Sequence, residues 1–263
     1  MRDGQAVNLP GNRHRHHTGP AIPAITSPME PAPAILYEDN HCLVVKKPFN
    51  MLVQPDSTGD LSLFTWAQTW IRDRYGKPGN VYVGIVHRLD RPAGGIVLLA
   101  RTSKSAARLS EQFRQGRVYK EYLVVVEGNP GPPRELVHYL QKNPELNRSR
   151  VSAVPGRGRK SCLTIRNVQF SGELSLLQVQ LETGRSHQIR AQLSHEGHPV
   201  VGDLRYGAST PLPSRNIALF AWRIAFEHPT RHTREVVVCN PPLDEFPWRS
   251  FSADVEILGK DSF

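Results

Sequence analysis

One short segment of the sequence places a carboxylate where it could take part in catalysis. Asp90 stands between Arg88 and Arg91, and Pro92 follows in a segment typical of a turn. An apolar run at 96–100 comes next and predicts a buried strand. Opposite charge within a few ångströms favours the ionised form of an acid, so these arginines would hold Asp90 as a carboxylate. An ordinary surface ion pair in a loop is the alternative interpretation.

The charge balance of the chain favours a polyanionic partner. Lysine plus arginine outnumber aspartate plus glutamate by 33 to 24, which gives 263 residues a formal net charge of +9. Such a protein binds nucleic acid in a salt-dependent way, although a generic basic protein kept soluble by its charge is the alternative. Cations gather at 101–120 and at 148–160, where interleaved glycines predict a mobile basic loop able to follow a phosphate backbone.

The composition also disfavours several classes of protein. Cys42, Cys162 and Cys239 fit neither a disulfide framework nor a zinc-ligand spacing, so we expect buried free thiols and no bound metal. No apolar run approaches the length of a membrane span or of a secretion signal. Glycine signatures of nucleotide-binding loops are also missing, which predicts no nucleotide cofactor. We therefore expect a soluble, cytoplasmic protein.

The chain is expected to form one ordered domain between two tails. Residues 1–33 are rich in Pro, Gly, His and Arg, and they hold too few large apolar side chains to offset the entropy of ordering. Their histidines could bind a metal opportunistically, but a disordered basic tail is favoured. The ordered domain is assigned to 34–250, and 251–263 is assigned to a C-terminal tail.

The elements that must position Asp90 can be placed from hydrophobic periodicity. Ser103 and Ser186 are expected to cap helices, and Gly76 and Gly116 to end them. Strands are expected at 35–37, 42–45, 96–100, 118–126, 177–181, 217–226 and 235–238, and helices at 63–71, 103–113 and 186–193. Strands outnumber helices without a regular βαβ alternation, which favours an α+β fold over a doubly wound sheet.

Five blocks of sequence together resemble one enzyme family. They keep that family's order and spacing from about residue 35 to 240, and they lie at 36–39 with 44–48, 87–90, 120–122, 184–190, and 198–203 with 206–207. On these blocks the chain resembles the RluA/RsuA group of RNA pseudouridine synthases. The resemblance implies a pseudouridine synthase fold, with a mixed, mostly antiparallel central sheet flanked by helices and loops.

The resemblance also implies a reaction and the residues that perform it. Uridine within RNA, ribosomal or transfer, would lose its base from the ribose C1′ and regain it through C5. Asp90 matches the family's catalytic aspartate, Tyr122 the tyrosine that packs on the target base, and Arg185 the arginine paired with the aspartate. Attack on C1′ and removal of a ribose proton both remain open as the role of Asp90. The Tyr122 hydroxyl is a candidate to help remove the C5 proton, and no cofactor is needed.

The partner of Asp90 is chosen between two arginines. Arg190 is the alternative, but Arg185 is preferred because the family motif places its first arginine there, before a helix start that favours anions. His87 and His187 are expected to have structural roles, and Asp203 is expected to accept backbone amides in a turn.

A stacked base hides its glycosidic bond, so the target should be flipped out of its helix at a cost of roughly a few kcal/mol. Arg88 could fill the vacated space or bind a phosphate. The candidate RNA-binding residues are Arg88, Arg91, Lys120, Arg148, Arg150, Arg157, Arg159, Lys160 and Arg190.

One departure from the family is visible, since Ala93-Gly94-Gly95 stands where Thr-Ser-Gly is common. The 34 residues before Ile35 are also too few and too polar to form the RNA-binding module that many members carry there.

Three other functions compete with that of an RNA pseudouridine synthase. A catalytically silent RNA-binding protein of the same fold would be free to lose Asp90. A glycoside hydrolase generally needs two carboxylates across the sugar, and a nucleotide-dependent enzyme needs a phosphate-binding loop. A monomer is the expected state.

Overall fold

The computed structural model describes residues 1, 32–152, 154 and 156–260. The predicted tail at 1–33 therefore lies almost wholly outside the described residues. None of the described helices combines the length and the apolar character needed to cross a lipid bilayer.

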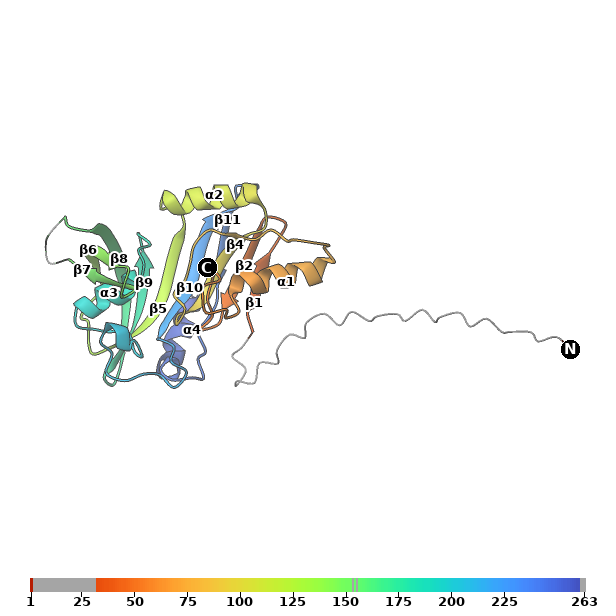
Figure 1. Cartoon of the computed structure of the whole chain (residues 1–263). Coiled ribbons are helices and arrows are strands. Elements are labelled where there is room, and N and C mark those ends of the chain that lie inside the picture. Colours follow the sequence, from red (N-terminus) through yellow and green to blue (C-terminus); the bar gives the residue numbers. More distant parts are fainter. Residues whose placement is uncertain (2–31, 153, 155, 261–263) are drawn as a thin grey trace.

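One long sheet organises the described part of the chain (Figure 1). Its strand order is β1-β2-β4-β10-β5-β9-β8-β6-β7, with β3 paired to β4 and β11 to β10. The pairings are antiparallel except the one between β4 and β10. The strands are β1 Ala34–Glu38, β2 Cys42–Lys47, β3 Gly84–Ile85, β4 Gly94–Ala100, β5 Tyr119–Glu127, β6 Arg134–Asn143, β7 Arg148–Val151, β8 Arg159–Ser171, β9 Leu174–Leu181, β10 Leu219–Glu227 and β11 Arg234–Val238.

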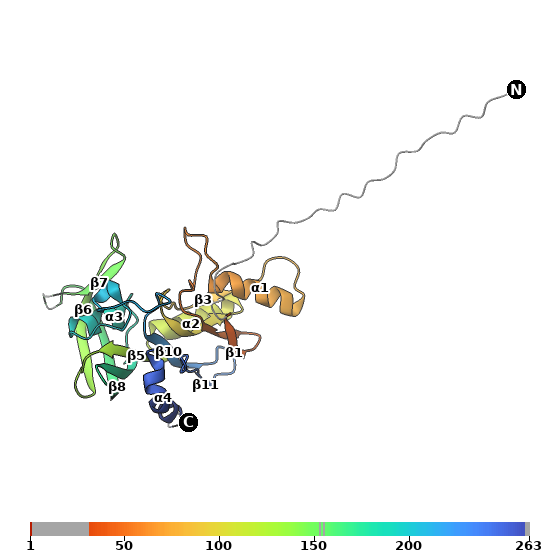
Figure 2. The ribbon, with the colours of Figure 1, turned by 90° about the horizontal axis from the view of Figure 1, so that it is seen from below.

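Helices lie at both ends of this sheet. They are α1 Leu63–Tyr75, α2 Ser103–Arg114, α3 Gln188–His195 and α4 Ser252–Lys260, with short 3-10 segments η1 Leu204–Tyr206 and η2 Trp248–Phe251. Figure 2 shows α3 grouped with β6 and β7 on one side, and α1 and α2 with β1 on the other. The expected α+β class, with a mixed and mostly antiparallel sheet, is confirmed.

The predicted strands and helices are present, and their ends have identifiable causes. β4 is buried along its whole length, as its unbroken apolar run predicts for a central strand. The Ser62 side chain accepts a hydrogen bond from Thr65 N at the start of α1, and Gly76 ends that helix in the left-handed conformation. The cap of α2 is Thr102, which forms a capping box with Ser105, so the predicted cap at Ser103 was one residue late.

Two predictions for the second half of the chain, the loop at 148–160 and the tail at 251–263, were wrong. Residues 148–160 do not form a single loop, because β7 and the start of β8 occupy both ends of that segment. Part of the predicted tail at 251–263 forms α4, whose Val255 is buried in the same core as the sheet. The boundary placed at residue 250 therefore cuts through packed structure.

Gly95 shows how tightly the start of β4 is packed. Its φ of 111° lies in the left-handed region, and a Cβ there would stand 2.3 Å from the Ala221 carbonyl oxygen on β10. The backbones of the two parallel strands meet at this point, since Gly95 is the register partner of Ala221. Only glycine fits this contact, which fixes the strand that follows the Asp90 segment.

Gly95→Ala should destabilise the protein by about 3 kcal/mol or more, because backbone strain and overpacking add together. Gly79→Ala is the matched control, since Gly79 also has a positive φ of 79° but a Cβ added there would meet nothing within 4 Å. That control should lose only about 1–2 kcal/mol. Urea unfolding of both variants measures the difference, and equal losses would contradict the role given to the Ala221 contact.

Candidate active site

Asp90 lies in the connection between β3 and β4, and its turn is held from two sides. The amide of Ala93 donates to the Asp90 carbonyl oxygen at 3.1 Å, which closes the turn. The fully buried Lys47 donates from Nζ to the carbonyl oxygens of Arg91 at 3.2 Å, Pro48 at 2.8 Å and Met51 at 2.8 Å. These bonds fix the backbone while the Asp90 side chain stays 24% exposed.

The arginine paired with Asp90 is Arg190. Its Nη1 donates to Asp90 Oδ2 at 3.0 Å, whereas Arg185 is exposed and donates from Nε to the Lys160 carbonyl oxygen at 3.3 Å. The preference for Arg185 as the partner was therefore wrong, and the alternative that named Arg190 gives the observed pair.

The start of α3 explains this difference. The helix begins at Gln188, after a left-handed His187 with φ of 54°, and Ser186 does not cap it. The buried Gln188 instead accepts from Arg185 N at 3.0 Å and from Thr183 Oγ1 at 2.8 Å. Arg185 is thus held outside the helix, while Arg190 lies in its first turn with only 4% of its side chain exposed.

A second carboxylate binds the other edge of the Arg190 guanidinium. Asp203 Oδ2 accepts from Arg190 Nε at 2.6 Å, and Oδ1 accepts from Nη2 at 2.9 Å. Burial disfavours the charged guanidinium, but the Asp203 and Asp90 carboxylates outweigh it and raise the pKa of Arg190 above its ordinary value. The expectation that Asp203 accepts backbone amides in a turn was wrong, because its oxygens face Arg190.

Tyr122 lies on β5 and lines the same small pocket as Asp90. Its side chain is almost fully buried. Burial, together with the nearby Asp90 charge, raises the pKa of Tyr122 well above its ordinary value. The hydroxyl therefore stays protonated at neutral pH and can donate a hydrogen bond, whereas a phenolate base is not available.

The small pocket has a volume of about 90 Å³. It shares several lining residues, among them Asp90 and Tyr122, with a larger groove of about 880 Å³. Arg185 lines both the pocket and the groove, although its guanidinium binds the Lys160 carbonyl oxygen and not Asp90. The side chains that line the groove include the cations Arg88, Arg91, Arg114, Lys120, Lys142 and Arg185 and the acids Asp56, Asp90 and Glu182. The groove is therefore positively charged around the acid.

The predicted RNA-binding residues divide between this groove and the rest of the surface. Arg88, Arg91 and Lys120 line it, and Arg190 lies in the small pocket. The cations of the 148–160 segment, namely Arg148, Arg150, Arg157, Arg159 and Lys160, are exposed and are not among the residues that line it. Arg114 and Lys142 line the groove without having been singled out, because nothing in the sequence indicates that the end of α2 and β6 approach the same space.

The two histidines near Asp90 are both engaged in hydrogen bonds. His87 Nε2 accepts from Leu98 N at 2.9 Å, and desolvation by burial lowers its pKa to about 3, so it stays neutral. His187 Nδ1 is 3.0 Å from the Tyr206 hydroxyl, and its Nε2 is 4.0 Å from Asp90 Oδ1. Burial lowers the pKa of His187 as well, against the opposing charge of Asp90.

The segment Ala93-Gly94-Gly95, which departs from the family pattern, lies next to the side chain of Phe49. A Cβ at Gly94 would stand 3.0 Å from the Phe49 ring. Phe49 thus occupies the space into which a side chain at position 94 would point. The Phe49 ring therefore lies beside Gly94 at the start of β4, where the family pattern has a serine.

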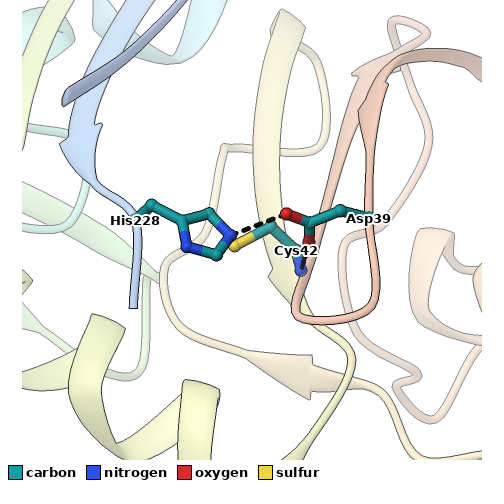
Figure 3. Close-up of side chains that lie close together, drawn as sticks. All are labelled: Asp39, Cys42 and His228. Carbon is teal, nitrogen blue, oxygen red and sulfur yellow. Dashed lines mark hydrogen bonds and ion pairs between the residues drawn. The ribbon is translucent and has the colours of Figure 1, made fainter. Parts of the chain in front are cut away.

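A second cluster of polar side chains lies away from the pocket and has the composition of a metal site. Figure 3 shows Asp39, Cys42 and His228 with their side chains close together, and their ligand atoms lie within 4.8 Å of one another. His228 follows β10, and Asp39 and Cys42 flank the turn between β1 and β2. A metal would need a deprotonated thiol and a free imidazole nitrogen.

The hydrogen bonds of this cluster favour a structural role. His228 Nδ1 accepts from Arg231 N at 3.0 Å, so Nε2 carries the proton that it donates to Asp39 Oδ2 at 2.6 Å. Burial alone would raise the pKa of Asp39, but hydrogen bonds from its neighbours, led by the amides of His41 and Cys42, lower it well below its ordinary value. Burial raises the pKa of the Cys42 thiol to about 12. A protonated thiol and an occupied imidazole do not suit a metal ion.

Comparisons with known proteins point to one enzyme family. A family model described as RNA pseudouridylate synthase matches residues 41–195. One curated relative is ribosomal large subunit pseudouridine synthase D of Zymomonas mobilis, 32% identical over 79% of this chain and 68% of the relative. The protein of the same name from Nitrosomonas europaea is 30% identical over 80% of this chain and 62% of the relative. This chain thus spans only about two thirds of the length of these relatives.

A solved structure also shares the fold. Human RNA pseudouridylate synthase domain containing 4 superposes with a TM-score of 0.67 at 20% sequence identity, covering 83% of this chain and 91% of that chain. The matched span of the family model includes Asp90, Tyr122 and Arg190, the residues that the structure brings to one pocket.

Replacing His228 should test the structural role of the second cluster. His228→Asn should lower the free energy of unfolding by about 1–3 kcal/mol, because the buried partners of the imidazole lose their hydrogen bonds. His232→Asn is the matched control, since His232 is exposed with φ of 60°, a conformation that asparagine tolerates. It should change stability by about 0.5 kcal/mol or less. A melting temperature that rises with added Zn²⁺ in the wild type, and not in His228→Asn, would contradict the structural assignment.

Proposed function

This chain belongs to the RNA pseudouridylate synthase family, and we propose that it isomerises uridine in RNA to pseudouridine with Asp90 as the catalytic carboxylate. The observation that carries the proposal is the geometry of the small pocket. There an acid paired with a buried arginine lies beside a buried tyrosine, in a groove lined with cations. Isomerisation within one nucleotide consumes no second substrate, and the proposal includes no cofactor.

The reaction breaks the bond between N1 of uracil and the ribose C1′ and forms a bond from C5 to the same carbon. Asp90 either attacks C1′ or removes a ribose proton, and both routes need an ionised carboxylate beside the sugar. Arg190 binds Oδ2 of Asp90, so the carboxylate is held in one orientation. The proton on C5 leaves to water in the last step, and N1 of uracil, released from C1′, takes up a proton, so the isomerisation balances. With a protonated hydroxyl, Tyr122 can orient a water or the uracil edge in that step, but it cannot serve as a phenolate base.

The groove supports RNA as the substrate. Its cations would contact phosphates, and Arg88 is exposed beside Asp90, where it could occupy the space left by a flipped base. The names of the curated relatives specify the large ribosomal subunit, so ribosomal RNA is proposed first and transfer RNA second. A monomer and a cytoplasmic location stay predictions.

Two other functions have less support. A glycoside hydrolase would need two acids across the sugar, but Asp90 alone carries a carboxylate among the described residues that line the small pocket. Asp203 is buried and bound to Arg190, so it is not available to a sugar. A silent RNA-binding protein would not need the Asp90–Arg190 pair, which is complete here.

Asp90→Asn should reduce pseudouridine formation by about 10³-fold or more, equivalent to about 4 kcal/mol of transition-state stabilisation. The asparagine keeps the size of the side chain, so RNA affinity should stay within about twofold. Asp73→Asn on the exposed face of α1 is the control for the same chemical change and should be fully active. Pseudouridine mapped on total ribosomal and transfer RNA measures both. Pseudouridine formation by Asp90→Asn at the wild-type rate would contradict the proposed mechanism.

The groove also makes a prediction about salt. The double variant of Arg114 and Lys142 to alanine should reduce the slope of log affinity against log salt by about 1.4–1.8, since each phosphate contact contributes about 0.7–0.9. The double variant of Arg157 and Arg159 to alanine compares two cations outside the groove lining. Filter binding from low to moderate salt gives both slopes. A larger reduction for Arg157 and Arg159 would move the RNA path onto the 148–160 segment.

A further inference from the structure

The hydrogen bonds of the Arg190 guanidinium are shared unequally between two carboxylates. Asp203 binds two of its nitrogens, Nε and Nη2, and Asp90 binds only Nη1. All three side chains converge from different segments, since Asp90 precedes β4, Arg190 is in α3, and Asp203 precedes η1. Arg190 and Asp203 are 4% and 2% exposed, so water does not compete for these bonds.

This division determines what Arg190 can do for Asp90. A guanidinium can bind one carboxylate through two parallel hydrogen bonds, and such a fork would engage both oxygens of Asp90. Asp203 occupies the fork formed by Nε and Nη2, and in this orientation Asp90 accepts one hydrogen bond from Arg190, on Oδ2 from Nη1. Oδ1 of Asp90 is therefore left for the substrate, with His187 Nε2 at 4.0 Å.

The charges of the three groups lead to the same conclusion. One guanidinium between two carboxylates leaves a net charge of −1, whereas Arg190 and Asp90 alone would be neutral. An acid that is fully neutralised and doubly hydrogen-bonded is a weaker base and a weaker nucleophile. Asp203 thus keeps the Asp90 carboxylate oriented while it remains reactive.

The surroundings hold this arrangement in place. The Arg190 guanidinium carbon lies over the Tyr206 ring, 4.8 Å from the ring centroid, so η1 packs on the guanidinium that Asp203 binds. The amide of Tyr206 donates to the Asp203 carbonyl oxygen at 2.9 Å, which closes the turn that carries both side chains. A rotation of Arg190 toward Asp90 would have to break these contacts.

We propose that Asp203 is a positioning residue for the isomerisation, which acts by binding Nε and Nη2 of Arg190 and so holds the guanidinium in the orientation that gives Asp90 one hydrogen bond. This inference rests on the proposed function, because it assigns a role within the same reaction. Asp203 touches neither RNA nor the reacting atoms, and its effect passes through Arg190 alone.

The test compares Asp203→Asn with Asp203→Glu. In Asp203→Asn, Arg190 loses one of its two ionic partners and can rotate until both oxygens of Asp90 accept from it, so kcat should fall by about 10²-fold while KM for RNA stays within about twofold. Asp90 then ionises more easily, because a like charge is gone and a hydrogen bond to its charged form is gained. The acid limb of the pH profile of kcat should therefore move to lower pH.

The glutamate variant and a control separate positioning from folding. Asp203→Glu restores a carboxylate and should recover part of kcat and the wild-type acid limb. Asp244→Asn, an exposed acid outside the pocket, should change neither. A loss of kcat in Asp203→Asn without any shift of the acid limb would show a merely structural role and overturn the proposal, as would wild-type kinetics.

A second measurement covers the case in which Asp203→Asn does not fold. In the Asp90→Asn variant, Asp203 should still hold the guanidinium, so the ¹⁵N signal of Arg190 Nε should stay protected from hydrogen exchange as in the wild type. Rapid exchange there would overturn the inference. This readout needs no activity, so it separates failure of the inference from failure of the proposed function, which the absence of pseudouridine with the wild-type protein would show.

Discussion

The site depends on one buried cation, the Arg190 guanidinium. It has to be satisfied on every side, because an unpaired buried charge costs several kcal/mol. Asp203 and Asp90 accept hydrogen bonds from it, and it lies over the ring of Tyr206. This requirement joins the β3–β4 connection, α3 and the η1 turn, which are distant in the sequence. The geometry of Asp90 is therefore a consequence of how a buried arginine is neutralised.

The groups around Asp90 have protonation states and hydrogen bonds that suit its proposed role as the reacting acid. His87 stays neutral because burial lowers its pKa to about 3, and Tyr122 stays protonated because burial and Asp90 raise its pKa. Lys47 is fully buried and binds backbone carbonyls, so its charge is used to hold the turn. The exposed cations lie farther out, along the groove. The partly buried acid of the pocket and the exposed cations of the groove thus lie at different depths.

The sequence predicts those parts of this site that are local. Asp90 lies in a turn before an apolar strand and Tyr122 lies in an apolar strand, so periodicity and the family motif place both correctly. The choice between Arg185 and Arg190 depends on where α3 begins, and composition does not reveal a left-handed His187 or a Gln188 side chain that accepts from Arg185 N. β6 to β8 escape prediction because polar and charged residues occupy most of their positions, and a register shift between Ile165 and Asn167 interrupts β8. The groove contributions of Arg114 and Lys142 depend on packing between distant elements.

Tyr206 connects the β6–β7 hairpin to the Asp90–Arg190 pair. Its hydroxyl accepts from Ser149 N on β7 at 2.9 Å, and its ring is contacted by the Arg148 guanidinium at 4.9 Å as well as by that of Arg190. The hairpin of β6 and β7 therefore cannot shift without disturbing the residue that packs on Arg190. Lys142 of the same hairpin lines the groove, so the fold fixes the spacing between this cation and Asp90. For the proposed function, a fixed spacing means that the shape of the RNA, as well as the target base, helps determine which uridine reaches the pocket.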